Sequence, residues 1–133
     1  MQTVLLAVNG TLMRGLELNR NLLDVGAKFV REHHTEACYR IWSIDDRHPA
    51  MLRTPGEGTR VAVELWEVPA VGLAKILQNE PAGLSIGKVL LSDGSIVLGV
   101  LGEPFLCKDR IEITRFGGWR AYIASKNGSD SRK

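Results

Sequence analysis

The sequence has 133 residues, of which 44% are hydrophobic and 24% are charged, and its formal net charge at pH 7 is +2. This length fits one domain with its own core, and this composition excludes a disordered, collagen-like or membrane-embedded chain. Without its last eight residues the chain holds 14 basic and 14 acidic side chains, a balance that excludes the concentrated basic surface required for nucleic-acid binding.

The first half of the chain predicts three strands and one short helix. Residues 3–8 form a continuous apolar run of strand length, and a short helix from about 20 to 25 would end before a glycine. Large apolar and polar side chains alternate over 39–44, which is typical of a half-exposed strand. Two prolines and two glycines predict a long surface loop over 45–58, and β-branched residues predict a strand over 61–68.

The second half begins with a predicted helix and a predicted hairpin. Pro69 suits a helix start, apolar residues then recur at helical spacing, and Pro81 ends the helix. Apolar runs over 86–91 and 96–101 are joined by a turn that contains Asp93-Gly94. Because these two residue types tolerate positive φ, we expect a β-hairpin with a type I′ turn.

A short closing helix is predicted near the C-terminus. Phe116, Trp119, Tyr122 and Ile123 recur at helical spacing, and Thr114 is a suitable N-cap. Glycines lie next to these positions, but the apolar spacing still favours a helix that covers the core.

The order of elements indicates the fold class. Strands outnumber helices and do not alternate regularly with them, which favours an α+β fold with a mixed or antiparallel sheet, or with a small barrel. We expect one domain over residues 1–125. The segment 126–133 lacks apolar residues, and we expect it to be a disordered tail.

The cysteines and the N-terminus predict a cytoplasmic location. Cys38 and Cys107 could form at most one bridge, and a domain of this size does not need one. The N-terminal apolar run lacks a basic flank and is too short for a signal peptide. No run approaches the roughly 18 apolar residues of a membrane span.

The junction after the first strand is the best candidate binding site. Asn9, Gly10, Thr11 and Leu12 follow the buried strand directly, and a glycine turn there would expose consecutive backbone N–H groups. Such a group of amides can hold a carboxylate or an oxyanion, and Arg14 could add a two-pronged contact to the same anion. A turn with only a structural role is the alternative.

Three glutamates are candidate acid–base groups: Glu64, Glu80 and Glu103. A carboxyl in an apolar pocket has a raised pKa and can then transfer protons near neutral pH. Glu64 shares a strand face with Ala62 and Trp66, so it needs a polar partner if that face is buried. Each glutamate could instead be an exposed or ion-paired carboxylate.

We expect no metal site and no cofactor, although one group of residues has a spacing that resembles a metal site. His33, His34 and Cys38 have a spacing that metals sometimes use, but no second cysteine or histidine pair completes four ligands. Glu32 and Glu36 indicate a solvated polar connector here. Neither cysteine has a neighbouring histidine in the sequence that would activate it as a nucleophile.

Taken in order, several motifs resemble the C-terminal domain of allophanate hydrolases. Each motif is short, and their order together with the Phe-Gly-Gly-Trp-Arg-Ala-Tyr ending makes the set specific. The resemblance spans roughly residues 4–123 and is carried by Val8–Asn19, Gly26-Ala27, Val63–Pro69, Ile86–Val89, Ser92–Ser95 with Gly99 and Glu103, and Ile113–Tyr122.

The resemblance implies a γ-glutamylcyclotransferase-like fold, in which a strand-end glycine loop holds the substrate and a glutamate is the acid–base group. Residues 9–12 match that loop. The family's loop carries a histidine implicated in decarboxylation where this chain has Thr11, and Gly102 replaces a common cysteine before Glu103. Glu80 stands where the family usually has an apolar residue, near the region of the cyclotransferase glutamate.

The resemblance implies three functions, which stay open at this point. The first is binding of a small carboxylate- or amide-bearing metabolite, with decarboxylation of N-carboxycarbamate in urea- or allophanate-type nitrogen catabolism. The second is cyclotransferase chemistry on a γ-glutamyl amine, with Glu80 as the base. The third is a non-enzymatic accessory subunit of a separately encoded amidase. We expect a free-standing form of the domain, and the family's oligomer contacts suggest a homodimer.

Overall fold

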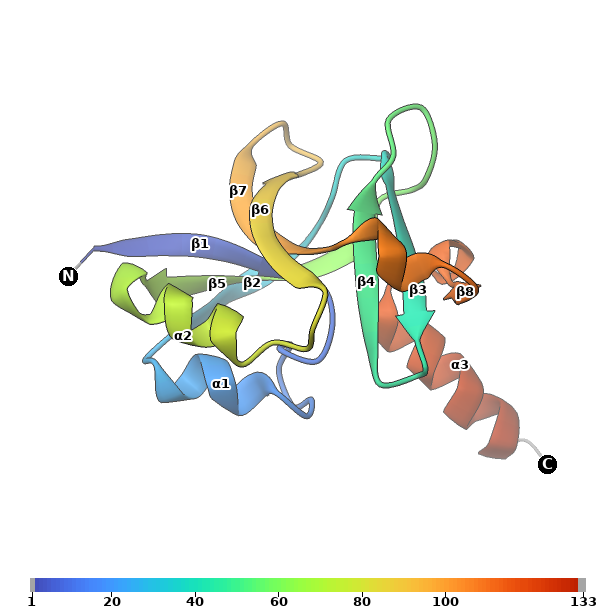
Figure 1. The fold of residues 1–133 in the computed structure, drawn as a ribbon, viewed down its shortest axis with the longest axis horizontal. Coiled ribbons are helices and arrows are strands. Elements are labelled where there is room, and N and C mark those ends of the chain that lie inside the picture. The colour runs from blue at the N-terminus through green and yellow to red at the C-terminus, as the bar shows by residue number, and fades with distance from the viewer. Residues whose placement is uncertain (1, 132–133) are drawn as a thin grey trace.

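The computed structural model describes residues 2–131 and contains eight strands and three α-helices (Figure 1). These elements confirm the predicted α+β class. The strands are β1 (Thr3–Val8), β2 (Lys28–His34), β3 (Tyr39–Ile44), β4 (His48–Arg53), β5 (Ala62–Pro69), β6 (Leu84–Leu90), β7 (Ile96–Gly102) and β8 (Ile111–Glu112). The helices are α1 (Asn19–Asp24), α2 (Leu73–Gln78) and α3 (Trp119–Ser131), with 3₁₀ turns η1 (Ala70–Gly72), η2 (Pro104–Cys107) and η3 (Thr114–Phe116).

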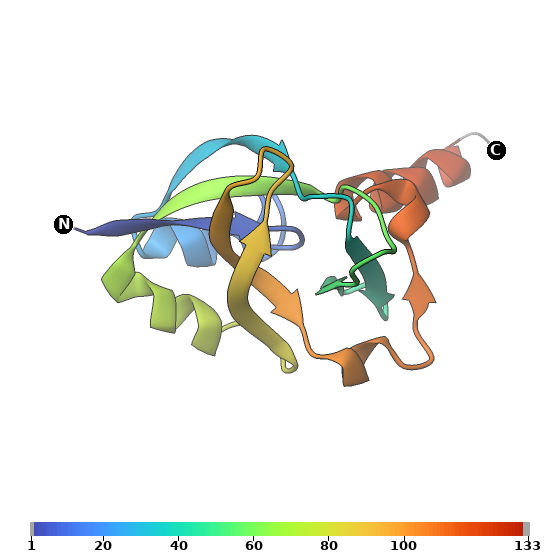
Figure 2. The same ribbon diagram turned by 90° about the horizontal axis from the view of Figure 1, so that it is seen from above.

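Five strands form a mixed sheet in the order β2-β5-β1-β7-β6. The β1–β7 pair is parallel and the other pairs are antiparallel. The apolar run of β1 fits its central place, because a strand with neighbours on both edges carries apolar side chains where both of its faces are covered, as at Leu6, Ala7 and Val8. Seen from above, β2, β5 and β1 run side by side and the β6–β7 hairpin crosses them (Figure 2).

Three further strands form a small antiparallel sheet in the order β4-β3-β8. This sheet meets the larger one where β4 lies beside β7. Gly102 at the end of β7 permits the contact, because a Cβ on it would lie 2.7 Å from the Cβ of Ala50. The glycine that replaces the family's common cysteine therefore allows close packing between the two sheets.

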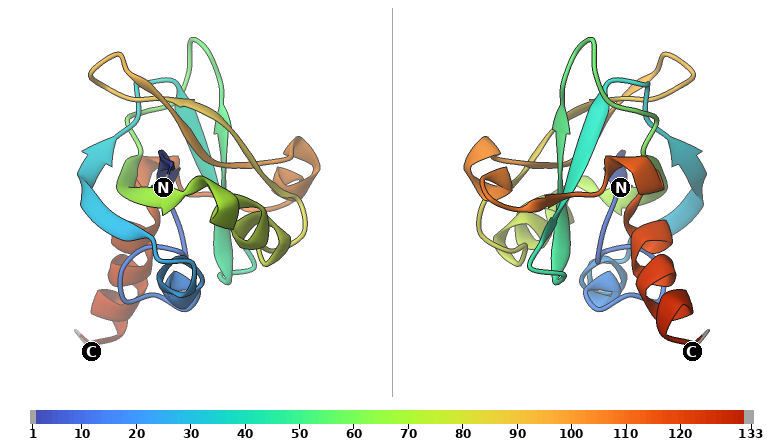
Figure 3. Two further views of the ribbon diagram at one scale, coloured as in Figure 1. Left: turned by 90° about the vertical axis from the view of Figure 1, so that its left-hand side faces the viewer. Right: turned by 90° about the vertical axis from the view of Figure 1, so that its right-hand side faces the viewer.

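The helices lie in two places. α1 and α2 lie together on one side of the five-stranded sheet (Figure 3). Gly72 brings them together, because a Cβ on Gly72 would lie 2.8 Å from the Cβ of Val25, just beyond α1. α3 lies at the other end of the molecule beside the small sheet, where Trp119 and Tyr122 are buried in the main core.

Two strands lie in segments that the sequence assigned to loops. The charged segment around Glu32, predicted to be a connector, is β2, the edge strand of the large sheet. An edge strand keeps charged side chains in solvent and so lacks the alternation that a buried face imposes. The predicted long loop over 45–58 contains β4, whose Pro49 suited a loop but is also tolerated on an edge strand.

Two local predictions are wrong although their elements exist. The β6–β7 hairpin does not have a type I′ turn, because Gly94 has positive φ and Asp93 does not. The hydrogen bond from Gly94 N to Leu91 O instead fits a type I turn followed by a left-handed glycine. Thr114 does not cap α3, since its Oγ accepts a hydrogen bond from Ile41 N in β3 at 3.0 Å.

The remaining sequence predictions concern the ends of the chain. α3 continues to Ser131 and so overlaps the predicted tail over 126–133, while residues 132–133 lie outside the described residues. The boundary at 125 stays a prediction. None of the helices within residues 2–131 has the length and hydropathy needed to cross a membrane.

Candidate functional site

The loop that follows β1 is fixed in position by two contacts. Asn9 is buried, and its Nδ2 donates a hydrogen bond to Val100 O in β7 at 2.8 Å. Gly10 packs against Pro49 of β4, and a Cβ on Gly10 would lie 2.5 Å from Pro49 Cδ. The glycine is therefore required by this close approach, because real Cβ atoms do not come so near a proline ring.

The backbone of this loop presents free donors and occupied acceptors. The carbonyl of Gly10 accepts from Met13 N, that of Thr11 from Leu18 N, and that of Leu12 from Asn19 Nδ2. Among the hydrogen bonds of residues 2–131, none has the amide of Gly10, Thr11 or Leu12 as its donor. These three successive amides are therefore unpaired within the part of the chain that the structure describes, and successive unpaired amides are the arrangement that binds anions in other folds.

Glu80 faces this loop across a small cavity. It lies just beyond α2 and lines, with residues 9–12, a cavity of about 10 Å³ that has the room of about one water molecule. Glu80 Oε2 is buried without a hydrogen-bond partner among the described residues. Burial raises the pKa of Glu80 to about 7, because a charged carboxylate loses solvation there.

A larger cavity of about 360 Å³ opens beyond the small one. Thr11 and Glu80 line both cavities, so the two meet at these residues. The outer cavity is also lined by the turn between β3 and β4, and its lining residues are Thr11, Glu17, Leu18, Arg47, His48, Asn79, Glu80 and Pro81. Its size is that of a site for a small ligand.

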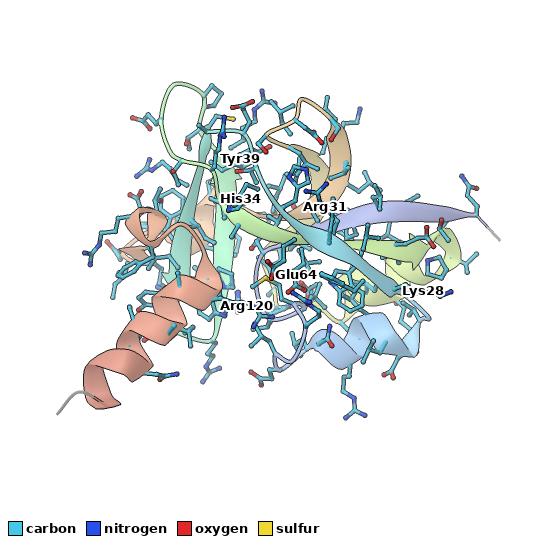
Figure 4. The ribbon with its side chains drawn as sticks, turned by 180° about the vertical axis from the view of Figure 1, so that it is seen from behind. Lys28, Arg31, His34, Tyr39, Glu64 and Arg120 are labelled. Atoms are coloured by element: carbon cyan, nitrogen blue, oxygen red, sulfur yellow. The ribbon has the colours of Figure 1, made fainter. Side chains whose placement is uncertain are left out.

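Glu64 is buried elsewhere and is fully hydrogen-bonded. Its Oε1 accepts from Arg14 N at 2.9 Å and from Trp66 Nε1 at 3.1 Å, and its Oε2 accepts from the guanidinium groups of Arg14 and Arg120, both at 3.1 Å. Figure 4 shows Glu64 beside Arg120 near the middle of this face. Burial by itself would raise the pKa of Glu64, but these hydrogen bonds outweigh it and lower the pKa.

Arg14 and Glu103 lie outside the cavity next to the loop. Arg14 stacks on Phe29, 3.7 Å from the ring centroid, and pairs with Glu32 and Glu64 at 2.8 and 3.1 Å. Glu103 is exposed, and its backbone N donates to Gly83 O. The structure thus brings together residues 9–12 and Glu80 of the predicted site residues, and it places Glu64, Arg14 and Glu103 apart from them.

Sequence reasoning named Thr11 and Glu80 but missed the other residues that line the outer cavity. Arg47 and His48 lay in the predicted long loop, and no local pattern marks them as site residues. Elsewhere within the described chain, no group of three or more His, Cys, Asp and Glu side chains could hold a metal ion. Burial raises the pKa of Cys107 to about 11, so its thiol is largely protonated at neutral pH.

The sequence pattern of one protein family, described as the allophanate hydrolase C-terminal domain, matches residues 4–124. The urea amidolyase of Lachancea kluyveri is 30% identical to this chain over 128 residues. The aligned region is 91% of this chain and 7% of that protein, so the chain spans a small part of this relative.

This chain also resembles solved structures over most of its length. The structure of a protein specific to uropathogenic E. coli has 57% identity and a TM-score of 0.92, over 93% of this chain and 98% of that one. The allophanate hydrolase of Kluyveromyces lactis has 27% identity and a TM-score of 0.88, over 94% of this chain and 22% of that one. A mouse AIG2-like protein, with 22% identity and a TM-score of 0.60, confirms the γ-glutamylcyclotransferase-like fold.

Proposed function

This chain belongs to the allophanate hydrolase C-terminal domain family, and on that premise we propose that it decarboxylates N-carboxycarbamate in the outer cavity, with the reacting carboxylate at Thr11 and Glu80, where this cavity meets the small one. More generally, the cavity binds a small metabolite that carries a carboxylate or an amide. The relatives named urea amidolyase and allophanate hydrolase support the proposal that this reaction belongs to urea- and allophanate-type nitrogen catabolism.

One observation carries this proposal. A carboxyl with a pKa of about 7 and a buried, unpartnered oxygen lines the same cavity as residues 10–12, whose backbone amides donate no hydrogen bond within residues 2–131. The amides offer positive partial charge to a carboxylate, and the carboxyl holds a proton that it can release near neutral pH. An acid and an anion site on one cavity are the two parts that protonation of a bound carboxylate compound needs.

The chemical step balances with one proton. In N-carboxycarbamate a nitrogen joins two carboxylates, and breaking one of its C–N bonds releases carbon dioxide. The electron pair of that bond stays on nitrogen, which takes the proton of Glu80, and carbamate leaves. The ionised Glu80 then recovers a proton from water. Glu80 thereby supplies the proton that a histidine would supply at the position of Thr11.

Glu80 suits this task better than Glu64, the other carboxyl considered. Glu64 is ionised at neutral pH and its two oxygens accept four hydrogen bonds from Arg14, Trp66 and Arg120, so it has neither a proton to give nor a free lone pair facing the loop. Its position supports a structural role.

The test measures carbon dioxide release by the purified protein. An amidase acting on allophanate generates N-carboxycarbamate in the same solution, and release is compared with and without this protein. We expect Glu80→Gln to lose about a hundredfold or more of the acceleration, since general acid catalysis contributes at least that much. Glu103→Gln is the matched control, because Glu103 is exposed outside the cavity. A rate that does not depend on the protein overturns the proposal.

The same arrangement also supports the cyclotransferase alternative, with Glu80 as a base. The two reactions need opposite protonation states of Glu80, so decarboxylation weakens above about pH 7 whereas cyclisation strengthens. Release of 5-oxoproline from a γ-glutamyl amine identifies the second reaction. If neither reaction occurs and the protein co-purifies with a separate amidase, it has an accessory role.

A further inference from the structure

The turn between β3 and β4 borders the outer cavity, which Glu80 also lines. Arg47 comes from this turn and His48 is the first residue of β4, while Thr11 comes from the loop after β1 and Glu80 from the segment just beyond α2. The outer cavity is therefore assembled from three parts of the chain, and the turn contributes its arginine.

The turn that carries Arg47 is held in place from several sides. Asp45 and Asp46 have φ of 55° and 57°, which fixes the tight reversal between the two strands. The Asp46 carboxylate accepts hydrogen bonds from Ser43 Oγ at 2.6 Å and Tyr122 OH at 2.7 Å, and it also pairs with Lys126 of α3. The backbone that presents the Arg47 side chain is thus fixed by its own strand and by α3.

Arg47 has an uncommitted guanidinium. Within residues 2–131, no carboxylate lies within ion-pair distance of it, whereas Arg14, Arg40, Arg110 and Arg120 all have acidic partners. The ionisable side chains that line the outer cavity are Glu17, Glu80, Arg47 and His48. Because Glu80 is largely neutral below about pH 7, Arg47 is the fixed positive charge of this cavity, and Glu17 is its fixed negative charge.

From this geometry we infer that Arg47 selects dicarboxylates, by binding the second carboxylate of a ligand whose first carboxylate lies at the amide of Thr11, beside Glu80, where the two cavities meet. The inference rests on the proposed function and narrows its substrate class. The ligand is malonate-like, with two carboxylates on one central atom, and N-carboxycarbamate has that form with nitrogen at the centre. A monocarboxylate uses the amides alone.

The test compares malonate with acetate as stable probes. Isothermal titration calorimetry at about pH 6, where Glu80 is mostly protonated, gives the affinity of each for the native protein and for Arg47→Met. We expect the substitution to weaken malonate binding about tenfold or more, because a charge-assisted hydrogen bond is lost. Acetate affinity should change less than twofold.

A matched control separates this contact from the general effect of charge. Arg53 is exposed on the same hairpin and lines none of the cavities described, so Arg53→Met removes the same charge without touching the site. It should leave malonate affinity within about twofold. Glu17→Gln removes the opposing charge on the rim and should strengthen malonate binding a few-fold.

Each remaining outcome decides between the two proposals. If native protein binds malonate no more tightly than acetate, or if Arg47→Met and Arg53→Met weaken malonate equally, the role of Arg47 is wrong while the anion site on the amides stands. If neither probe binds at all, the anion site itself fails, and the proposed function fails with it.

Discussion

At the scale of single residues, the carboxyls of Glu64 and Glu80 behave differently because of their surroundings. Glu64 accepts hydrogen bonds from two arginines, a tryptophan and a backbone amide, and its pKa is lowered. Glu80 is half-buried, its buried Oε2 has no hydrogen-bond partner among residues 2–131, and its pKa is raised. An unpartnered buried carboxyl costs stability when it ionises. Its presence beside a cavity is therefore evidence for a functional role.

The raised pKa of Glu80 predicts a loss of stability as pH rises. In the unfolded chain this carboxyl loses its proton near 4.5, while in the folded protein it keeps the proton to about 7. Between these two pH values the folded state binds more protons than the unfolded state. The free energy of unfolding therefore falls as the pH rises from about 4.5 to 7, and it levels off above pH 7. We expect Glu80→Gln to be more stable than native protein at pH 8, by up to about 3 kcal/mol.

Urea denaturation at pH 5 and pH 8 measures this effect. The difference between native protein and Glu80→Gln should be small at pH 5 and large at pH 8, while Glu103→Gln should follow the native protein at both values. Equal stabilities of native protein and Glu80→Gln at pH 8 would mean that ionisation of Glu80 does not destabilise the folded state.

At the scale of elements, the loop after β1 depends on the strand β4 that packs against it. A methyl group on Gly10 would occupy the space of the Pro49 ring. Gly10→Ala should therefore destabilise the protein by about 1–3 kcal/mol, as overpacking does, and it should also displace the amides that we propose bind the ligand.

A double-mutant cycle checks this contact. Pro49→Ala removes the ring, so Gly10→Ala should cost much less stability in that background than in the native one. Free energies of unfolding from urea titrations of the four proteins give the coupling. If the double variant loses as much free energy of unfolding as the two single variants together, the clash with Pro49 is not what excludes a side chain at residue 10.

The elements also differ in how well the sequence predicted them. β1, β5 and the β6–β7 hairpin were predicted because apolar or β-branched runs end at clear turn residues. The edge strands β2 and β4 were missed, since charges and Pro49 are typical of loops unless pairing is known. Residues 9–12 and Glu80 were named from the sequence and lie together, whereas Arg47 was not named, because nothing local places it near them.

At the scale of the whole molecule, Glu64 joins three distant parts of the chain. It lies on β5, Arg14 follows the loop after β1, and Arg120 belongs to α3. Glu64→Gln keeps the shape but removes the charge that faces both arginines. We expect Glu64→Gln to lower the free energy of unfolding by about 2–3 kcal/mol. This is less than the full cost of breaking a buried ion pair, because the two arginines are partly exposed.

Hydrogen exchange distinguishes this joining role from a role in the cavity. The amides of α3 should exchange faster in Glu64→Gln than in native protein, while acetate binding at residues 9–12 should persist under conditions where the variant is folded. Native exchange rates in α3 together with lost acetate binding would assign Glu64 to the ligand site instead.

The amino-acid sequence by itself determined the α+β class, the family resemblance and the loop after the first strand, because these depend on local patterns of apolar residues, glycines and prolines. The tertiary structure decided which glutamate meets that loop and which is held by arginines. It also decided that Arg47 borders the same cavity. Burial and hydrogen-bond partners set a carboxyl's pKa, and both come from segments far apart in the chain that only folding brings together.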